Sequence, residues 1–482
     1  MLTAHMKSLQ RSTIRLYADP RRVLARYLNF GNPARIAPVA DYVRQLTTAA
    51  AKAQLDALLD NFADRHDDLR AVFRDNYAKL IPVIPALEEP VKQELLGAFF
   101  THEYSTEAAA LFNPSIVPHP DQTDLPAGAL RFLMSLRATG EGHISSVAFA
   151  TGQVTAEGTI IFDERAPHQF AGRPPQEPTS YDKAFLLQRL ALAAPDLAVL
   201  QAALPDSFTR EQALAVVNAL NGLAPTQQTA IEAAITQVFD LNYDVRFSPA
   251  TPVSSRVLFP QSQAETNGME DVRFVAFDHE KKRRYLGTYT AYNGRAIQPQ
   301  LIETTDFIHF KIRPFYGAAA SDKGMALFPE KIGGRYAMIG RQDGRNLTLM
   351  YADALHFWDT ALPLQHPQRG WEMLQMGNCG SPIKTAHGWL LLTHAVGPMR
   401  QYVLSCSLLD LERPEQVIAS LERPLLSPNA EEREGYVPNV LYTCGMLAHA
   451  GQLIIPYAMS DSAISFATVS QAELLNELLN QQ

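Results

Sequence analysis

Two adjacent carboxylates and an arginine stand in one short motif near the middle of the chain, Gly268-Met269-Glu270-Asp271-Val272-Arg273. An apolar run with strand character, Arg284 to Tyr292, follows the motif. Side chains alternate along extended backbone, so we expect Glu270 and Asp271 to face opposite ways and Asp271 and Arg273 to share a side. A carboxylate fixed beside a scaffold strand suits proton donation. The six residues alone are more often a charged surface turn with a salt bridge.

The elements that would position this motif are strands of one repeated form. Each begins after a turn, runs apolar and ends in small or polar residues, at 131–137, 284–292, 335–341, 388–396 and 452–459. The last four start about 50 to 65 residues apart, a period that favours propeller blades of several short strands. We therefore predict a mainly β protein, a five-bladed β-propeller with its motif residues around one funnel. A β-sandwich is the structural alternative.

Two regions have helical rather than strand character. Apolar residues at three- and four-residue spacing indicate helices before residue 105, and Ala/Leu-rich segments indicate a second helical region. Thr209 and Gln212 form a predicted capping box in that second region, where helices are expected at 182–194, 209–220 and 226–239. We divide the chain into an N-terminal helical region, the first blade, a helical insertion and the remaining blades, at 1–105, 106–165, 166–245 and 246–482.

Composition is that of an ordinary globular protein. The net charge is −8 and hydrophobic residues make up 46% of the chain, so no basic field favours nucleic acid or anionic membrane. The basic N-terminus lacks the apolar core of a signal peptide, and no apolar run is long enough to span a membrane. Three scattered cysteines and dispersed histidines predict neither a disulfide framework nor a metal site. We expect a cytoplasmic protein without a cofactor, with its N-terminal helices available for homo-oligomerisation.

Short motifs along the chain, in order and spacing, resemble glycoside hydrolase family 130, the mannoside phosphorylases and related inverting β-mannosidases. The matching stretches include Phe112-Asn113-Pro114, Gly268 to Arg273, Leu327 to Ile332, Gly377 to His394, Leu409 to Pro414 and Glu434 to Val440. The resemblance covers about 108–162 and 246–470. The longer members of the family, which resemble oligomannan phosphorylases, carry helical additions like the two regions left unmatched.

The resemblance implies roles for individual residues. Asp271 matches the general acid of the family, in a motif that has Val272 where the family usually has proline, and it would act through the 3-hydroxyl of the sugar. Inorganic phosphate as nucleophile needs cations, and the residues in phosphate-contacting segments are Lys323, Arg341, Lys384 and His394. The residues expected to bind the substrate are Asn113, Arg137, Glu270, Arg273, Tyr292, Glu434 and Asp461.

Three functions remain open from the sequence. The first is an inverting phosphorylase of the glycosyltransferase type, which cleaves β-mannoside oligosaccharides with inorganic phosphate as co-substrate and forms α-mannose 1-phosphate. The second is an inverting β-mannosidase, which uses water and takes Glu434 or Glu270 as the base. The third is a carbohydrate-binding propeller without chemistry. Dependence of product release on phosphate separates the first two functions, and turnover of any kind excludes the third.

Overall fold

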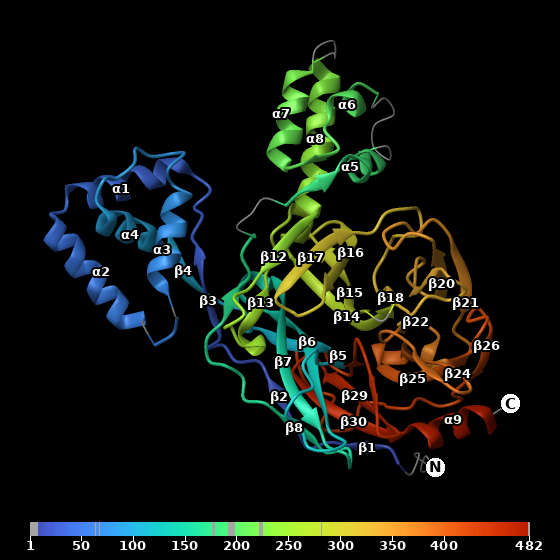
Figure 1. Ribbon diagram of the computed structural model, residues 1–482. Coiled ribbons are helices and arrows are strands. Elements are labelled where there is room, and N and C mark those ends of the chain that lie inside the picture. Colours follow the sequence, from blue (N-terminus) through green and yellow to red (C-terminus); the bar gives the residue numbers. More distant parts are fainter. Residues whose placement is uncertain are drawn as a thin grey trace.

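The computed structural model describes residues 8–62, 64–66, 68–175, 179–190, 198–220, 225–280 and 282–480. The protein is mainly β, as predicted, and two groups of helices stand apart from the β body (Figure 1). One group follows the N-terminal strands, and the other is inserted between strands of the body. Within these residues, no helix combines the length and the apolar character needed to cross a membrane.

All five predicted repeat strands are present, and each pairs antiparallel with the strand that follows it. The five strands are β6 (Leu130–Thr139), β15 (Lys282–Tyr292), β19 (Tyr336–Gly340), β24 (Gly388–Val396) and β29 (Gln452–Met459). Their partners are β7 (Ser145–Val154), β16 (Ile297–Thr304), β20 (Leu347–Ala352), β25 (Tyr402–Leu409) and β30 (Ala463–Ser470). The repeat in the sequence is therefore a repeat of antiparallel hairpins.

Further strands flank each hairpin and complete five antiparallel groups, which we number in chain order. The strands that precede the hairpins are β5 (Ala110–Pro118), β14 (Gly268–His279), β18 (Ala326–Leu327), β22 (Gln375–Asn378) with β23 (Ile383–Thr385), and β27 (Leu441–Tyr442) with β28 (Leu447–His449). The strands on the far side are β8 (Ile160–Phe162), β17 (His309–Pro314), β21 (Ala361–Gln365) and β26 (Val417–Ser420). Groups one and two join into one sheet where Gly268 pairs with Ser145. A Cβ at position 268 would lie 2.6 Å from the Ser145 nitrogen, so this close approach requires glycine.

Apolar cores fill the interfaces between consecutive groups, and a further core joins group five to group one. Each core draws side chains from both neighbours, in order Phe149 with Phe274, Phe277 with Met338, Phe328 with Trp389, Leu404 with Tyr457, and Phe466 with Phe132. Helix α9 (Gln471–Asn480) packs on the core between groups four and five. Burial of one such side chain stabilises the fold by about 1.5–3 kcal/mol.

The N-terminal region is α-helical only from Ile36 to Phe99, which corrects the prediction of helix from residue 1. Strands β1 (Gln10–Arg11) and β2 (Leu16–Tyr17) pair with β30 and complete group five. Strand β3 (Val23–Tyr27) pairs with β4 (Thr101–Ser105) and connects the bundle to the body. The edge of β30 provides the hydrogen bonds that make β1 and β2 strands, and β4 provides those of β3. The bundle consists of α1 (Ile36–Gln45), α2 (Thr48–Phe62), α3 (Leu69–Ala78) and α4 (Pro90–Phe99).

The insertion is helical, as predicted, and short strands accompany its helices and connect it to the body. Its helices are α5 (Lys183–Leu190), α6 (Ala198–Ala203), α7 (Arg210–Ala219) and α8 (Pro225–Leu241). The predicted capping box opens α7, with the Thr209 side chain accepting from the Gln212 backbone and the Gln212 side chain from that of Thr209. The predicted helix at 191–194 lies outside the described residues. The short strands are β9 (Phe170–Ala171), β10 (Tyr181–Asp182), β11 (Ser207–Phe208), β12 (Tyr243–Arg246) and β13 (Arg256–Leu258).

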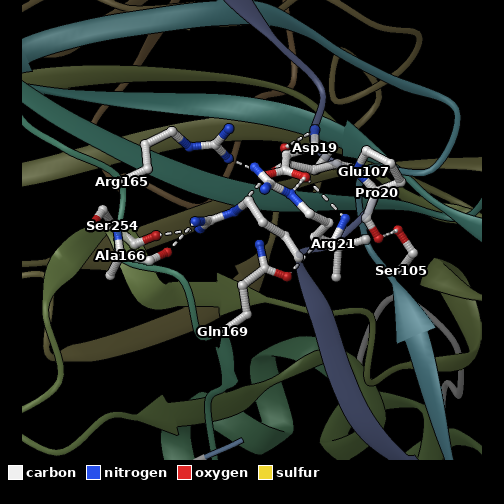
Figure 2. Close-up of polar contacts among 12 residues, drawn as sticks. Asp19, Pro20, Arg21, Ser105, Glu107, Arg165, Ala166, Gln169 and Ser254 are labelled. Carbon is white, nitrogen blue, oxygen red and sulfur yellow. Dashed lines mark hydrogen bonds and ion pairs between the residues drawn. The ribbon is translucent and has the colours of Figure 1, made fainter. Parts of the chain in front are cut away.

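A buried cluster of charges joins the N-terminal strands, the first group and both ends of the insertion (Figure 2). The fully buried Glu107 accepts hydrogen bonds from Arg22 Nε at 3.1 Å and from the Asp19 nitrogen at 3.0 Å, and it also pairs with Arg165. Arg22 in turn donates to the Ser254 carbonyl oxygen at 2.5 Å. Loss of one partner would leave a buried charge uncompensated, so the cluster fixes how these segments meet.

Candidate active site

A cavity of about 270 Å³ opens where strands of all five groups end. Many of the predicted site residues line it, namely Asn113, Arg137, Asp271, Lys323, Arg341, His394 and Asp461. The other lining residues are Phe112, Gly324, Gln375, Arg400, Tyr402, Val437, Val440 and Tyr442. Side chains from segments almost 350 residues apart in the chain therefore meet at one place.

Several polar side chains reach the cavity from left-handed backbone, among them Asn113, Asp271 and Asp461. The φ angles are 49° at Asn113, 57° at Asp271 and 53° at Asp461. The ladder between β5 and β6 shifts register between Phe112 and Ser115, and the ladder between β14 and β15 shifts between Glu270 and Arg273. Such bulges re-aim side chains and cost backbone strain that the surrounding sheet must offset. The strain gathers at the cavity, where strand irregularity turns polar groups inward.

The expected alternation of side chains along 270–273 is wrong, because β14 has a bulge there. Glu270 and Asp271 both reach Arg137, whose Nη2 donates to Glu270 Oε1 at 2.7 Å and whose Nη1 donates to Asp271 Oδ1 at 3.0 Å. Arg273 is almost fully buried and donates to the backbone oxygen of Asp271 at 2.8 Å rather than to its carboxylate. Alternation fails because the extra residue of a bulge leaves the pleat. Arg273 therefore lies beneath the cavity and supports Asp271 from behind.

Asp271 is the carboxylate with the most contacts in the cavity. Asn113 Nδ2 donates to its Oδ1 at 2.6 Å, beside the contact from Arg137. Burial alone would raise the pKa of Asp271, but the charges of Arg137, Arg273 and Lys323 and the hydrogen bond from Asn113 outweigh it and lower this pKa. Asp271 is therefore ionised at neutral pH and held in position by Asn113 and Arg137.

Asp461 shares the cavity but has the opposite shift. Burial raises the pKa of Asp461 to about 6, the charge of Asp271 adds to this effect, and Arg137 and Arg400 oppose it. Two carboxylates of one cavity thus hold their protons over different pH ranges, which is the usual arrangement for acid–base chemistry.

Cations line the cavity from groups three and four, and we call this part of the lining the cationic wall. Lys323 and Arg341 line it, and Arg341 has the Asp322 carboxylate only at 3.8 Å, with no hydrogen-bond partner for its Nε among the described residues. Arg400 stands on the exposed rim, 5.8 Å from the centre of the Tyr402 ring, without a hydrogen bond or ion pair to any residue of the described part. These guanidinium groups are free to bind an anion.

His394 is a neutral group at the base of the cationic wall. Burial lowers the pKa of His394 well below its usual value, and the charges of Arg341 and Arg273 lower it further. Its ring stacks on Tyr402 with the centroids 6.0 Å apart, and its Nε2 has no partner within the described chain. A buried nitrogen without a partner is costly, so it is suited to bind a ligand atom.

The remaining predicted site residues do not reach the cavity lining. Glu270 is buried and held by Arg137 on one oxygen and by Lys323 Nζ, at 2.7 Å, on the other. Tyr292 lies behind Lys323, with its ring centre 5.4 Å from Nζ. Glu434 is exposed on the loop before β27. These residues can act on the site only through others or from its rim.

Lys384 is placed away from the cavity altogether. Its Nζ pairs with Glu330 at 2.6 Å, and the residue lines a separate apolar pit of about 230 Å³. Lys384 is opposite Trp389 in the ladder of β23 and β24, whereas His394 lies five residues further along β24, a distance of about 17 Å at the usual rise per residue. Two residues of one sequence segment thus stand at opposite ends of one strand.

Several lining residues were not anticipated from the sequence, and Arg400 is the most informative of them. Arg400 follows Met399, and both have left-handed backbone, with φ of 54° and 57°. Two consecutive non-glycine residues with positive φ are uncommon, and the turn they form points a cation to the cavity rim. The sequence signal was weak, because Gly-Pro-Met-Arg resembles any polar turn.

Within the described chain, no group of three metal-ligating side chains occurs.

Comparisons with known proteins identify the family of this chain. A family model for glycoside hydrolase family 130, described as beta-1,4-mannooligosaccharide phosphorylase, matches residues 234–480, just over half of the chain. A 1,2-beta-oligomannan phosphorylase from Thermoanaerobacter sp. is 32% identical over 223 residues, which are 45% of this chain and 73% of that protein. A beta-1,2-mannobiose phosphorylase from Listeria innocua is 28% identical over 46% of this chain and 63% of its own.

Among solved structures, the beta-1,2-mannobiose phosphorylase of Listeria innocua bound to beta-1,2-mannobiose aligns with 78% of this chain and 93% of its own. The TM-score is 0.46 and the sequence identity is 17%. On the family match and the Thermoanaerobacter relative, the chain belongs to glycoside hydrolase family 130.

Proposed function

We propose that this protein is an inverting phosphorylase that cleaves β-mannosides with inorganic phosphate and releases α-mannose 1-phosphate. The observation that carries the proposal is the division of charge in the cavity. Asp271 and Asp461 line the cavity with Arg137 from groups one, two and five, and the cations Lys323, Arg341 and Arg400 line it from groups three and four. The names of the relatives, which are mannoside phosphorylases, support the same reaction.

Phosphate would occupy the cationic wall. Arg341 and Arg400 offer planar N–H groups that can grip two phosphate oxygens, Lys323 adds a compact charge, and His394 Nε2 faces the same space. Phosphate is already an anionic nucleophile, so the protein needs to hold and orient it rather than to generate it. Arg341 Nε and His394 Nε2 have no hydrogen-bond partner within the described residues, whereas Lys323 Nζ pairs with Glu270.

The mannose ring would lie against the other wall, between Asp271, Asn113, Arg137 and Asp461. A phosphate oxygen attacks the anomeric carbon as the bond from that carbon to the leaving oxygen breaks. The leaving oxygen takes a proton from the sugar's 3-hydroxyl, and that hydroxyl takes the proton of Asp271. Asp271 therefore ends the step as a carboxylate, and inversion at carbon 1 gives the α-phosphate.

Asp271 must be protonated to act as the general acid, but its lowered pKa keeps it ionised at neutral pH. Lys323 is one of the charges that lower the pKa of Asp271. A phosphate anion at Lys323 and Arg341 would cancel part of this positive field and raise the pKa of Asp271, because a nearby negative charge disfavours the carboxylate. Monobasic phosphate also brings a proton of its own. Binding of phosphate would thus favour the protonated form of Asp271, which can act as the general acid.

Hydrolysis has less support, because neither carboxylate predicted as its base lines the cavity. Glu270 is engaged by two cations, and Glu434 is exposed outside the cavity. An inverting hydrolase needs its base on the face from which water attacks.

We also infer that the five antiparallel groups are the blades of a five-bladed β-propeller. Four apolar cores lie between consecutive groups, and a fifth core lies between the fifth group and the first. This closed series supports a ring rather than the two layers of a sandwich. The N-terminal bundle and the insertion then stand on the outside of the ring as helical additions (Figure 1).

Product analysis tests the reaction directly. Purified protein is incubated with β-1,2-mannobiose and with β-1,4-mannosyl-glucose, with and without inorganic phosphate. Mannose 1-phosphate that forms only with phosphate supports the proposal. Free mannose at a rate independent of phosphate overturns it in favour of hydrolysis, and absence of turnover on both sugars and on longer β-mannosides favours a binding protein.

A further inference from the structure

A second, larger cavity lies between the N-terminal bundle and the β body. Its volume is about 860 Å³, against about 270 Å³ for the candidate active site. The bundle side of this interdomain cleft comes from β3 and α3, and the body side comes from segments 169–174 and 259–261. The reaction proposed above uses none of these residues.

Arg26 is the central charge of the interdomain cleft. Its guanidinium carbon lies 3.8 Å from the centre of the Phe259 ring and 5.0 Å from that of Tyr104. Within the described chain it makes no hydrogen bond and no ion pair, and burial lowers its pKa. Stacking on rings satisfies the faces of a guanidinium but not its N–H edges. A charge partly removed from water without a counter-charge is costly.

A second cation faces the same cleft. Lys79 ends α3, its Nζ lies 5.1 Å from the centre of the Tyr27 ring, and its one described hydrogen bond goes to Asn76 Oδ1 at 3.1 Å. Burial lowers the pKa of Lys79, Asp75 opposes the shift, and the charge of Arg26 lowers it further. The two cations are thus close enough to repel each other across the cleft.

The carboxylates that line the cleft are engaged elsewhere. Asp75 pairs with Arg173 at 3.3 Å, and Asp68 accepts from the Ala71 nitrogen at 3.0 Å as the cap of α3. Neither forms an ion pair with Arg26 or Lys79. The guanidinium of Arg26 therefore has no carboxylate partner in the cleft, and Asp75 acts on Lys79 only without a direct ion pair.

We propose that the interdomain cleft is a second binding site, for the phosphate group and ring of a phosphorylated sugar. Arg26 and Lys79 would bind the phosphate, the first through paired N–H groups and the second as a point charge. The Tyr27 ring and the amides of Asn29 and Gln261, all in the cleft lining, suit a sugar ring and its hydroxyls. The site is separate from the candidate active site and does not depend on the reaction proposed for it.

The walls of the cleft are held in place before any ligand arrives. Gln169 in its floor contacts Thr106 at 2.6 Å, next to the buried cluster of Arg22, Glu107 and Arg165 (Figure 2). Also on the body side, Glu265 accepts from the Gln261 nitrogen at 3.0 Å. A preformed site loses little conformational entropy when it binds.

Titration calorimetry tests the proposal with α-mannose 1-phosphate and mannose 6-phosphate as probes and mannose as the uncharged control. The full chain carries Arg341→Gln so that the candidate active site contributes little phosphate binding. We expect Arg26→Met and Lys79→Met each to weaken binding of a phosphorylated probe at least tenfold. Lys52→Met, an exposed lysine on α2 of the same bundle, should leave binding unchanged.

Two readouts separate a binding role from a structural one. Lys79→Met is at the surface and keeps the aliphatic contact with Tyr27, so it tests the site even if Arg26→Met fails to fold. In the otherwise unchanged chain, Lys79→Met should leave turnover of β-mannosides within about twofold, since the cleft takes no part in catalysis. Unchanged affinity in both variants, or no binding of either phosphorylated probe, overturns the proposal.

Discussion

The two ends of strands β5 and β14 differ in backbone regularity, polarity and charge pairing. At one end, β5, β14 and the turn after β29 carry left-handed polar residues, register shifts and charges that are only partly paired. At the other end, β5 and β14 line an apolar pit with Ile116, Val117 and Phe274, and the charges nearby, Lys384 and Glu330, pair with each other. The register shifts and left-handed backbone at Asn113 and Asp271 thus turn polar groups of these two strands toward the cavity.

Matched substitutions at the two ends turn this comparison into experiments. Each of two strands offers the same residue type at both ends: aspartates 271 and 278 on β14, and arginines 341 and 335 on either side of β19. If the cavity end performs the chemistry, the first member of each pair should matter and the second should not.

Asp271→Asn should have the largest effect. The amide keeps the shape of the side chain but cannot donate the proton, so we expect kcat to fall by about 10³. Phosphorolysis rates with saturating β-mannoside and phosphate measure this. Asp278→Asn, at the far end of the same strand, removes only an exposed pair with Arg283 and should stay within about twofold. Equal losses in the two variants would mean that Asp271 acts on folding rather than on chemistry.

Arg341→Gln should act on phosphate more than on the sugar. The loss of a charged contact to phosphate is expected to lower kcat/KM for phosphate by about 10², with the KM for mannoside changed much less. Arg335→Gln is the matched control, since Arg335 is exposed and pairs with Asp353 at 3.3 Å. A rise in the mannoside KM alone would place Arg341 on the sugar side of the cavity.

The sequence was sufficient to predict the repeat strands, but not the backbone conformation where the strands meet the cavity. The repeat strands could be found because apolar runs between turns reflect local preference and burial. The bulges at Asn113 and Asp271 could not, since a positive φ at a non-glycine residue is imposed by the surrounding sheet rather than by the residue itself. Arg400 was missed for the same reason, as its position depends on a strained turn.

Errors of placement have a similar cause. Lys384 and His394 belong to one matching segment of the sequence, and a resemblance carries no information about which end of a strand a residue occupies. The ladder of β23 and β24 decides it, and places them on opposite sides of the body. Strands β1 and β2 were missed because their partner, β30, lies more than 440 residues away in the chain.

Asp461→Asn should stabilise the protein in a pH-dependent way. Because burial raises the pKa of Asp461 from 3.8 to about 6, the folded state holds this proton more tightly than the unfolded state. The charged form therefore destabilises the fold, increasingly between pH 3.8 and 6 and fully above pH 6. We expect the variant to gain up to about 3 kcal/mol at pH 7.5 and little at pH 4.

Urea unfolding of both proteins across this pH range measures the effect, and the other end of the strands gives the opposite sign. The hydrogen bond from Arg283 lowers the pKa of Asp278, so that carboxylate helps the fold above its unfolded pKa and loses this contribution as the pH falls. A stability gain for Asp461→Asn that did not grow between pH 4 and pH 7.5 would show that packing, not charge, is responsible.

Lys384→Gln should have the smallest effect, and it is the sharpest test of which end of the strands binds phosphate. Lys384 is about half exposed and pairs with Glu330, whose side chain is 41% exposed. Pairs of this kind stabilise proteins by about 0.2–1 kcal/mol at most, so we expect a small change in stability and less than a twofold change in kcat/KM for phosphate. Lys323→Gln, a lysine of the cationic wall, should lower the same constant at least tenfold. A comparable loss in Lys384→Gln would return Lys384 to the phosphate site and would contradict the assignment of the pit as the inactive end.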